Sequence, residues 1–141
     1  ELRHRECRLN GVVREAHTVI VDLRYGDCQL REVCQVFHDG RIRDGRGLPG
    51  EKLHIGERPL LGFRRCLRQE LGILIGRGYA GVHELGGDVK IGMSSSYPGI
   101  LTRNVHVYFT YEMPKKFFKK HGYVEWQPDK STYFDWFPVE Q

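Results

Sequence analysis

The sequence predicts a mixed fold, in which one well-marked α-helix lies among several β-strands, and three patterns carry this prediction. Residues 12–23 are rich in β-branched side chains and end in a nearly continuous apolar run, as in a strand buried on both faces. Residues 102–111 alternate apolar and polar side chains, which is typical of a strand with one buried face. Between them, residues 59–72 repeat leucine and phenylalanine at spacings of three and four, which indicates an amphipathic helix.

Length and composition place the chain among ordinary globular proteins. Its 141 residues, 40% hydrophobic and 28% charged, suit a single domain over residues 1–141 with a core of its own. The start without Met is also expected of a domain cut from a longer protein. A net charge of +4 and a pI near 9.0 favour anionic ligands such as phosphates without requiring nucleic acid.

Targeting signals and cysteine spacing give weaker information. No apolar run approaches the roughly 18 residues that cross a bilayer, and no signal peptide is visible. The four cysteines fall in no spacing typical of a zinc site (Cys7, Cys28, Cys34 and Cys66). We therefore expect an intracellular, reduced chain without a membrane segment.

The elements before and just after the helix follow from turn signals. Residues 12–23 and 29–37 are expected to form a hairpin across a turn at residues 25–27. After the helix, residues 74–84 contain three glycines and are expected to be a loose connection, with a short strand near 79–85. The Gly86-Gly87-Asp88 triplet is expected to turn the chain into a new strand that begins at Val89.

The C-terminal part is expected to be mostly strands. In residues 102–111 one face would carry Val105, Val107 and Phe109, and the other face would carry polar side chains. Residues 113–121 place four lysines around two phenylalanines, as in a short amphipathic helix or turn whose aromatic rings pack on the domain. The alternative is a phosphate-binding patch. Residues 123–126 and 132–137 are expected to close a hairpin.

The central helix is clearly delimited. Pro59 suits a first helical turn, where its missing N–H costs nothing, and Gly72 suits a left-handed stop. One helix face carries the apolar side chains Leu60, Phe63, Leu67 and Leu71.

Residues Leu48 to Ile73 resemble the box motif of Nudix hydrolases. The family pattern is a Gly, five residues, a Glu, seven residues, then Arg-Glu-aliphatic-x-Glu-Glu-x-Gly-aliphatic. The chain matches it without gaps at six positions: Glu57, Arg65, Leu67, Glu70, Gly72 and Ile73. It departs from the pattern at three positions: Glu51 stands for the Gly, Cys66 for the first helix Glu and Gln69 for the second.

The resemblance implies a fold and a chemistry. The fold would be an α/β (α+β) Nudix fold, in which a mixed, curved sheet is sandwiched by the box helix and one or two further helices. The chemistry would be hydrolysis of nucleoside diphosphate derivatives with Mg²⁺ or Mn²⁺, held by carboxylates of the helix. In this chain the implied metal site keeps Glu57, Glu70 and the Gly50 carbonyl, and Arg65 organises it.

The three departures weaken that chemistry. A thiol is a soft ligand and a glutamine is neutral, so neither replaces a carboxylate at a magnesium site. We therefore expect a weakened site and little or no hydrolysis. Glu51 either restores one lost charge or is an exposed loop residue. Cys66 is either an inert, partly buried thiol or, beside several arginines, a reactive thiolate.

A second group of candidate residues would bind a ligand rather than a metal. Serine hydroxyls and arginine can hold phosphate oxygens, and a tyrosine ring can stack on a base. The candidates are Ser94, Ser95, Ser96, Tyr97 and Arg103, together with Gly50 and Glu51 of the box loop.

Three functions are consistent with these residues. The first is a Nudix-like domain that binds a nucleoside-diphosphate-type ligand, ADP-ribose or a related molecule, or a protein partner. The second is an active metal-dependent pyrophosphohydrolase, whose further acid would come from a loop (Glu51, Glu84, Asp88, Glu112 or Glu125). The third is RNA binding on the same fold, although no dedicated RNA motif is present.

Overall fold

The computed structural model describes residues 13–75, 81–93 and 101–139. Eight strands, one α-helix and one 3-10 helix occur in these ranges. In chain order they are β1 (Val13–Tyr25), β2 (Cys28–Phe37), β3 (Ile42–Gly47), β4 (Gly50–Lys52), α1 (Pro59–Leu71), β5 (Val82–Met93), β6 (Leu101–Glu112), η1 (Lys115–Phe117), β7 (Tyr123–Trp126) and β8 (Lys130–Pro138). None of the helices in these ranges has the length and apolar character needed to cross a membrane.

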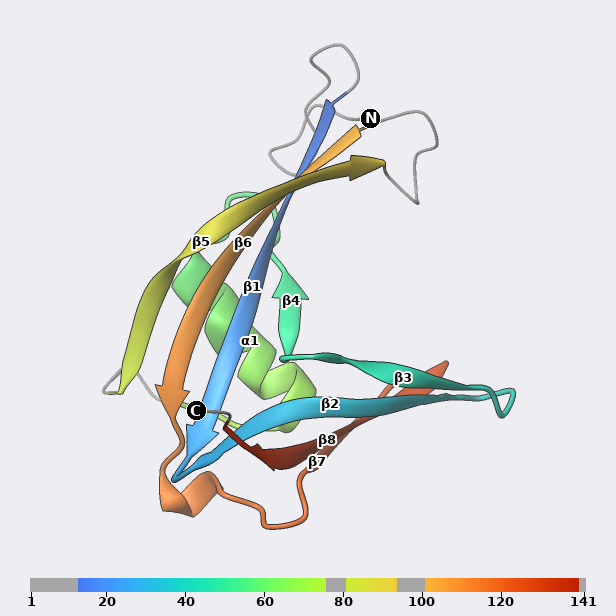
Figure 1. The fold of residues 1–141 in the computed structure, drawn as a ribbon, viewed down its shortest axis with the longest axis vertical. Coiled ribbons are helices and arrows are strands. Elements are labelled where there is room, and N and C mark those ends of the chain that lie inside the picture. Colours follow the sequence, from blue (N-terminus) through green and yellow to red (C-terminus); the bar gives the residue numbers. More distant parts are fainter. Residues whose placement is uncertain (1–12, 76–80, 94–100, 140–141) are drawn as a thin grey trace.

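All eight strands belong to one mixed sheet (Figure 1). Its main path is β5-β6-β1-β2-β8-β7, while β3 pairs with β2 and β4 pairs with β1. β1 and β6 are parallel, and the other pairs are antiparallel. A mixed sheet with one α-helix confirms the predicted α+β fold class.

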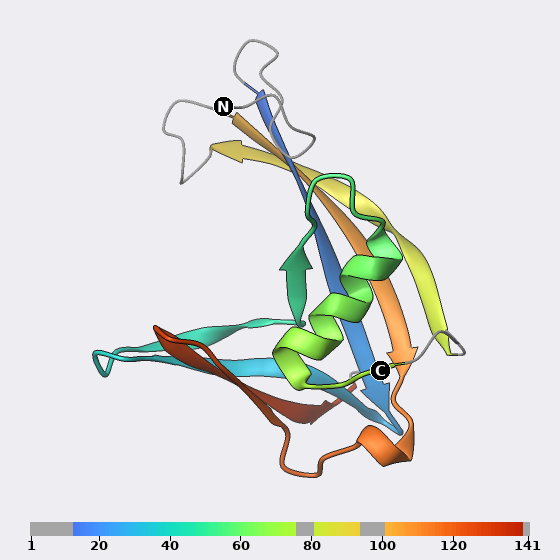
Figure 2. The ribbon, with the colours of Figure 1, turned by 180° about the vertical axis from the view of Figure 1, so that it is seen from behind.

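The sheet bends sharply where β1 passes into β2. The two strands pair only next to their turn, at Arg24 with Gln29 and Tyr25 with Cys28. Beyond that point they part, and β2, β3, β7 and β8 run across the direction of β1, β5 and β6 (Figures 1 and 2). β4 takes the place beside β1 that β2 has left, through pairing of Thr18 to Ile20 with Gly50 to Lys52.

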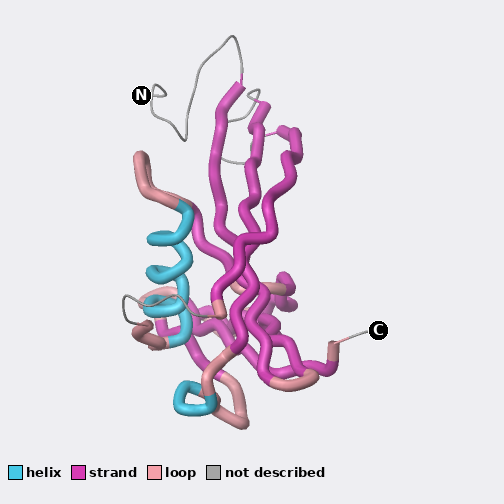
Figure 3. The backbone as a smooth tube through the Cα atoms, turned by 90° about the vertical axis from the view of Figure 1, so that its left-hand side faces the viewer, coloured by secondary structure: helices cyan, strands magenta, loops and turns pink. Residues whose placement is uncertain are grey.

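The predicted helix is confirmed at both ends. Pro59 occupies its first turn, and Gly72 ends it in the left-handed region at φ 70°. The Gly72 N–H donates to the Arg68 carbonyl, and the Ile73 N–H to the Leu67 carbonyl, which satisfies the last turn. α1 lies against one face of the sheet (Figure 3), where the Phe63 ring packs 5.2 Å from that of Phe109, measured between centroids.

The burial of β1 agrees with the prediction on one face only. Val19, Val21 and Leu23 are completely buried against the helix side of the sheet. Thr18 and Ile20 point to the opposite face and are only partly buried. The prediction of a strand buried on both faces is therefore wrong, because the second face opens at the bend of the sheet.

β5 corrects the prediction of a turn at residues 86–88. One strand runs from Val82 to Met93 along β6, with a register shift between Glu84 and Gly86. Gly86 has φ 87°, and a Cβ on Gly87 would lie 2.1 Å from the His106 carbonyl oxygen. The glycines therefore serve a β-bulge and a close approach of two backbones, and not a reversal of the chain.

This correction can be tested with Gly87→Ala. A methyl group there would collide with the backbone of β6, so we expect a loss of about 1–3 kcal/mol in the free energy of unfolding. Gly92→Ala is the matched control in the same strand, because a methyl group at residue 92 would meet no other part of the protein within 4 Å. Urea unfolding measures both. Equal stability of the two variants would favour an open turn at residue 87.

β3 and β4 were not predicted from the sequence, because Gly45, Gly47 and Gly50 are of a residue type that is typical of turns. In β3, a Cβ on Gly45 would lie 1.9 Å from the Glu32 carbonyl oxygen, and Gly47 has φ 103°. These positions lie at the irregular pairing of β3 with β2 between Glu32 and Cys34. Glycine therefore permits this pairing, where a side chain would prevent it.

The C-terminal elements agree with prediction. Phe118 stacks on Tyr25 with 3.9 Å between ring centroids, and the Tyr123 hydroxyl donates to the Phe117 carbonyl. The predicted packing of residues 113–121 on the domain is confirmed, and its helical part is the single turn η1. The four lysines are exposed, and β7 and β8 form the predicted hairpin.

Candidate functional site

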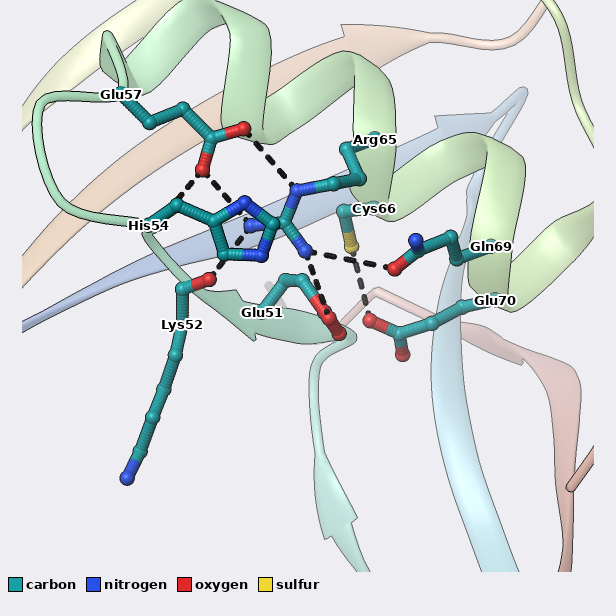
Figure 4. A network of polar contacts seen from close by, with 8 residues as sticks. All are labelled: Glu51, Lys52, His54, Glu57, Arg65, Cys66, Gln69 and Glu70. Carbon is teal, nitrogen blue, oxygen red and sulfur yellow. Dashed lines mark hydrogen bonds and ion pairs between the residues drawn. The ribbon is translucent and has the colours of Figure 1, made fainter. Parts of the chain in front are cut away.

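The box loop and helix are tied together by one side chain, Arg65 (Figure 4). Its Nε and Nη2 donate to the two carboxylate oxygens of Glu57, at 3.1 and 2.9 Å. Nη2 also donates to the Lys52 carbonyl at 2.6 Å, while Nη1 lies 3.4 Å from both Glu51 and Gln69 oxygens. These hydrogen bonds join β4, the loop before the helix and α1 through Arg65, whose side chain is only 11% exposed.

Glu57 is the main partner of Arg65. The Glu57 Oε1 also accepts the His54 backbone N–H at 2.9 Å, which closes the loop before the helix. The hydrogen bonds from Arg65 lower the pKa of Glu57, so this carboxylate is ionised at neutral pH. Both oxygens thus serve to position the loop. The predicted organising role of Arg65 is consistent with this geometry.

Cys66 and Glu70 form a second, deeper pair. The Cys66 thiol donates to the Glu70 Oε2 at 3.1 Å, inside the protein. Burial raises the pKa of Cys66 well above its usual value, so the reactive-thiolate alternative is not favoured. Cys66 is completely buried in the core, which is deeper than the partly buried thiol expected from the sequence.

Glu70 is the acid most altered by its surroundings. The residue is 7% exposed, and burial raises the pKa of its carboxyl from 4.5 to about 8. The thiol hydrogen bond acts in the opposite direction, while the charges of Glu51, Glu125 and Glu32 raise the value further. At neutral pH most Glu70 side chains are therefore protonated and neutral.

Glu70 lines a cavity of about 390 Å³ at the bend of the sheet. Glu70 reaches it from α1, and three more glutamates line the same cavity from three strands: Glu32 on β2, Glu51 on β4 and Glu125 on β7. Burial also raises the pKa of Glu51 and Glu125. Lys130 is the only cation among the described residues of the lining. The rest of the lining is polar or apolar (Thr18, Ile20, Gln35, Leu48, Pro49, Gly50, Gln127, Thr132 and Phe134).

The metal ions that the resemblance implies fit these donors poorly. Mg²⁺ and Mn²⁺ prefer ionised oxygen ligands. Here Cys66 offers a buried thiol, Glu70 is mostly protonated and Glu57 is held by Arg65. Within residues 13–75, 81–93 and 101–139, no three His, Cys, Asp or Glu side chains are grouped so that they could hold a metal ion.

The predicted ligand-binding residues do not all come together. Gly50 and Glu51 line the cavity, but Arg103 lies on β6 and forms an ion pair with Glu15. Ser94, Ser95, Ser96 and Tyr97 lie outside the described residues.

Of the acids proposed from outside the box helix, only some lie at the cavity. Glu51 and Glu125 reach the cavity, whereas Glu84 and Glu112 are exposed elsewhere. Asp88 bonds to His106 and Tyr108 on the neighbouring strand. Glu32 was missed, because a lone glutamate in an alternating strand carries no signal of the cavity it faces.

Comparisons with known proteins concern the fold. No family model matches the chain, and no curated protein matches its sequence. A solved structure of the MutT mutator protein from Bacillus halodurans is similar over 87% of this chain and 68% of that one, with 16% identity and a TM-score of 0.46. A Nudix hydrolase from Nitrosomonas europaea is similar over 86% and 73%, with 14% identity and a TM-score of 0.41. At these identities the similarity is one of fold.

Proposed function

We propose that the chain is a Nudix-like binding domain with little or no diphosphate hydrolysis. The Cys66–Glu70 pair carries this proposal. The last acid of the box is buried, is mostly protonated at neutral pH and accepts a hydrogen bond from the residue that replaces another box acid. Such a pair supplies neither the charge nor the ligand set that a magnesium-dependent hydrolase needs.

The proposed ligand is a nucleoside-diphosphate-type molecule, ADP-ribose or a related compound, or else a protein partner. The cavity at the bend of the sheet is the proposed binding place. Its glutamates repel a diphosphate when they are ionised. The raised pKa values of Glu51, Glu70 and Glu125 favour the protonated, neutral carboxyls, which do not repel it. We therefore expect tighter diphosphate binding at mildly acidic than at alkaline pH.

Thermal unfolding with ADP-ribose, with and without Mg²⁺, tests this proposal. A ligand at about 100 times its dissociation constant adds roughly 2.7 kcal/mol of stability. We expect such stabilisation at pH 6, a smaller effect at pH 8.5 and no AMP in the mixture. The absence of stabilisation by ADP-ribose would leave the protein-partner alternative, and rapid Mg²⁺-dependent cleavage of ADP-ribose would contradict the proposal.

The active pyrophosphohydrolase remains the second candidate function. One observation favours it: Glu32, Glu51 and Glu125 bring carboxylates from outside the box helix to the cavity of Glu70. Metal-dependent hydrolysis that is lost in Glu70→Gln would support this candidate over the first.

A restored box separates the two candidates further. The double variant Cys66→Glu with Gln69→Glu should gain stability from Mg²⁺, because the ion would neutralise carboxylates that otherwise repel each other. The double variant's matched control is Cys66→Gln, which adds similar bulk without charge. No added response to Mg²⁺ would mean that the geometry of the site, as well as its charge, has changed.

A further inference from the structure

β5 forms one edge of the sheet (Figure 1). It pairs with β6 along its length, and no other described strand pairs with it. Twelve residues form this edge, Val82 to Met93, and they contain no proline. An edge strand of this length offers a row of backbone N–H and C=O groups to another strand.

The side chains of β5 divide into two distinct faces. Val89 and Ile91 point to one face, and they are 46% and 68% exposed. Asp88 and Lys90 point to the other face, because side chains alternate along a strand. The strand therefore carries an acid and a base two positions apart on one face and exposed apolar groups on the other.

We propose that β5 pairs with β5 of a second copy of this chain, antiparallel, about a two-fold axis at Val89. In this register residue 88 faces residue 90 of the partner copy, and residue 87 faces residue 91. Asp88 then lies opposite Lys90 twice, once on each side of the axis. On the other face Val89 meets its own copy, and Ile91 lies over Gly87, which has no side chain to displace.

Charge selects this register among its neighbours. An axis moved by one residue to position 88 would set two Asp88 side chains opposite each other, and an axis at position 90 would do the same for Lys90. Like charges directly opposed on a sheet are unfavourable, whereas opposite charges are favourable. Such an isologous contact also closes after two copies, because both edges are used up in the pair.

Asp88 is already held in place for this contact. Its two carboxylate oxygens lie 3.1 Å from His106 Nδ1 and from the Tyr108 hydroxyl, which fixes the carboxylate on its face of the sheet. The side chain is still 49% exposed, so a lysine from a neighbouring strand can reach it. Two copies paired in this way would form one continuous sheet through both domains.

Charge-reversal variants test the pairing, because a loss of structure at residue 88 or 90 would not reproduce the pattern of results expected here. Sedimentation equilibrium over a range of concentrations should show a dimer of the wild-type chain. Asp88→Lys and Lys90→Asp should each weaken dimerisation by roughly tenfold or more. The double variant Asp88→Lys with Lys90→Asp should recover it, and an equimolar mixture of the two single variants should form a heterodimer.

Controls keep the result interpretable. Asp39→Lys makes the same reversal at an exposed acid of the β2–β3 turn and should leave the dimer unchanged. Lys90→Asp leaves the Asp88 contacts with His106 and Tyr108 in place, so it reports on pairing even if Asp88→Lys fails to fold. A wild-type chain that is monomeric at every concentration would overturn the proposal, and so would a dimer that Lys90→Asp does not weaken.

Cross-linking locates the axis independently. Val89→Cys should give a disulfide-linked dimer under mild oxidation, because the two residues face each other across the axis. Ile91→Cys should not, since the two copies of residue 91 would lie about four residues apart along the strands. The wild-type chain under the same oxidant controls for its own cysteines. Equal cross-linking of both variants would contradict this register.

Discussion

Glu70→Gln is expected to make the protein more stable than the wild type, by an amount that grows from about pH 5 and is complete above about pH 8. The native carboxyl has a pKa of about 8, against 4.5 when it is exposed. Between these values the folded protein holds a proton that the unfolded chain releases, so rising pH favours unfolding at about 1.4 kcal/mol per pH unit. Glutamine has nearly the same shape, accepts the thiol hydrogen bond and cannot ionise.

The measurement is the free energy of unfolding in urea between pH 5 and 9. The wild-type value should fall relative to that of Glu70→Gln as pH rises, until the difference reaches a few kcal/mol. Glu57→Gln provides a control with the opposite effect on the free energy of unfolding. Because the pKa of Glu57 is lowered and its ionised form stabilises the fold, this variant should be less stable than the wild type. Parallel pH profiles for the wild type and Glu70→Gln would show that residue 70 is not a buried acid.

Arg65→Ala is expected to cost about 3–5 kcal/mol of stability. It would remove contacts to Glu57, Glu51, Gln69 and the Lys52 carbonyl at once, and it would leave partly buried carboxylates without their cation. Arg65→Lys should recover only part of the loss, because an ammonium group cannot donate in two directions as a guanidinium does.

Arg68→Ala serves as the matched control for Arg65, since Arg68 is exposed on the same helix and its loss should change stability by less than about 0.5 kcal/mol. Urea unfolding monitored by tryptophan fluorescence compares the three variants. If Arg65→Ala were as stable as Arg68→Ala, the arginine would not be what joins β4 to the helix.

The helix and the strands with clear patterns could be predicted because their signals are local. Pro59, Gly72 and the spacing of Phe63 and Leu67 define α1 within a few residues of sequence. β5 and β3 could not be predicted in the same way. Their glycines carry the same local signal as turns, and only the neighbouring backbones show that they belong to bulges.

The residue types of the candidate site could be predicted from the sequence, but the protonation of Glu70 could not. The substitutions at residues 66 and 69 already indicated a weakened box. The proton on Glu70, however, depends on burial and on Glu32, Glu51 and Glu125, which lie far apart in the sequence. The bend between β1 and β2 brings these four side chains to one cavity. Their spacing in the sequence gives no sign of this.

The parallel pairing of β1 with β6 has a consequence for how the chain acquires its structure. Val13 pairs with Leu101, which lies 88 positions further along (101 minus 13), and the pairing continues to Arg24 with Glu112. Contacts between such distant residues form slowly, because a long loop must close before they contribute. During synthesis, β1 must therefore wait without its parallel neighbour until residues 101–112 have left the ribosome.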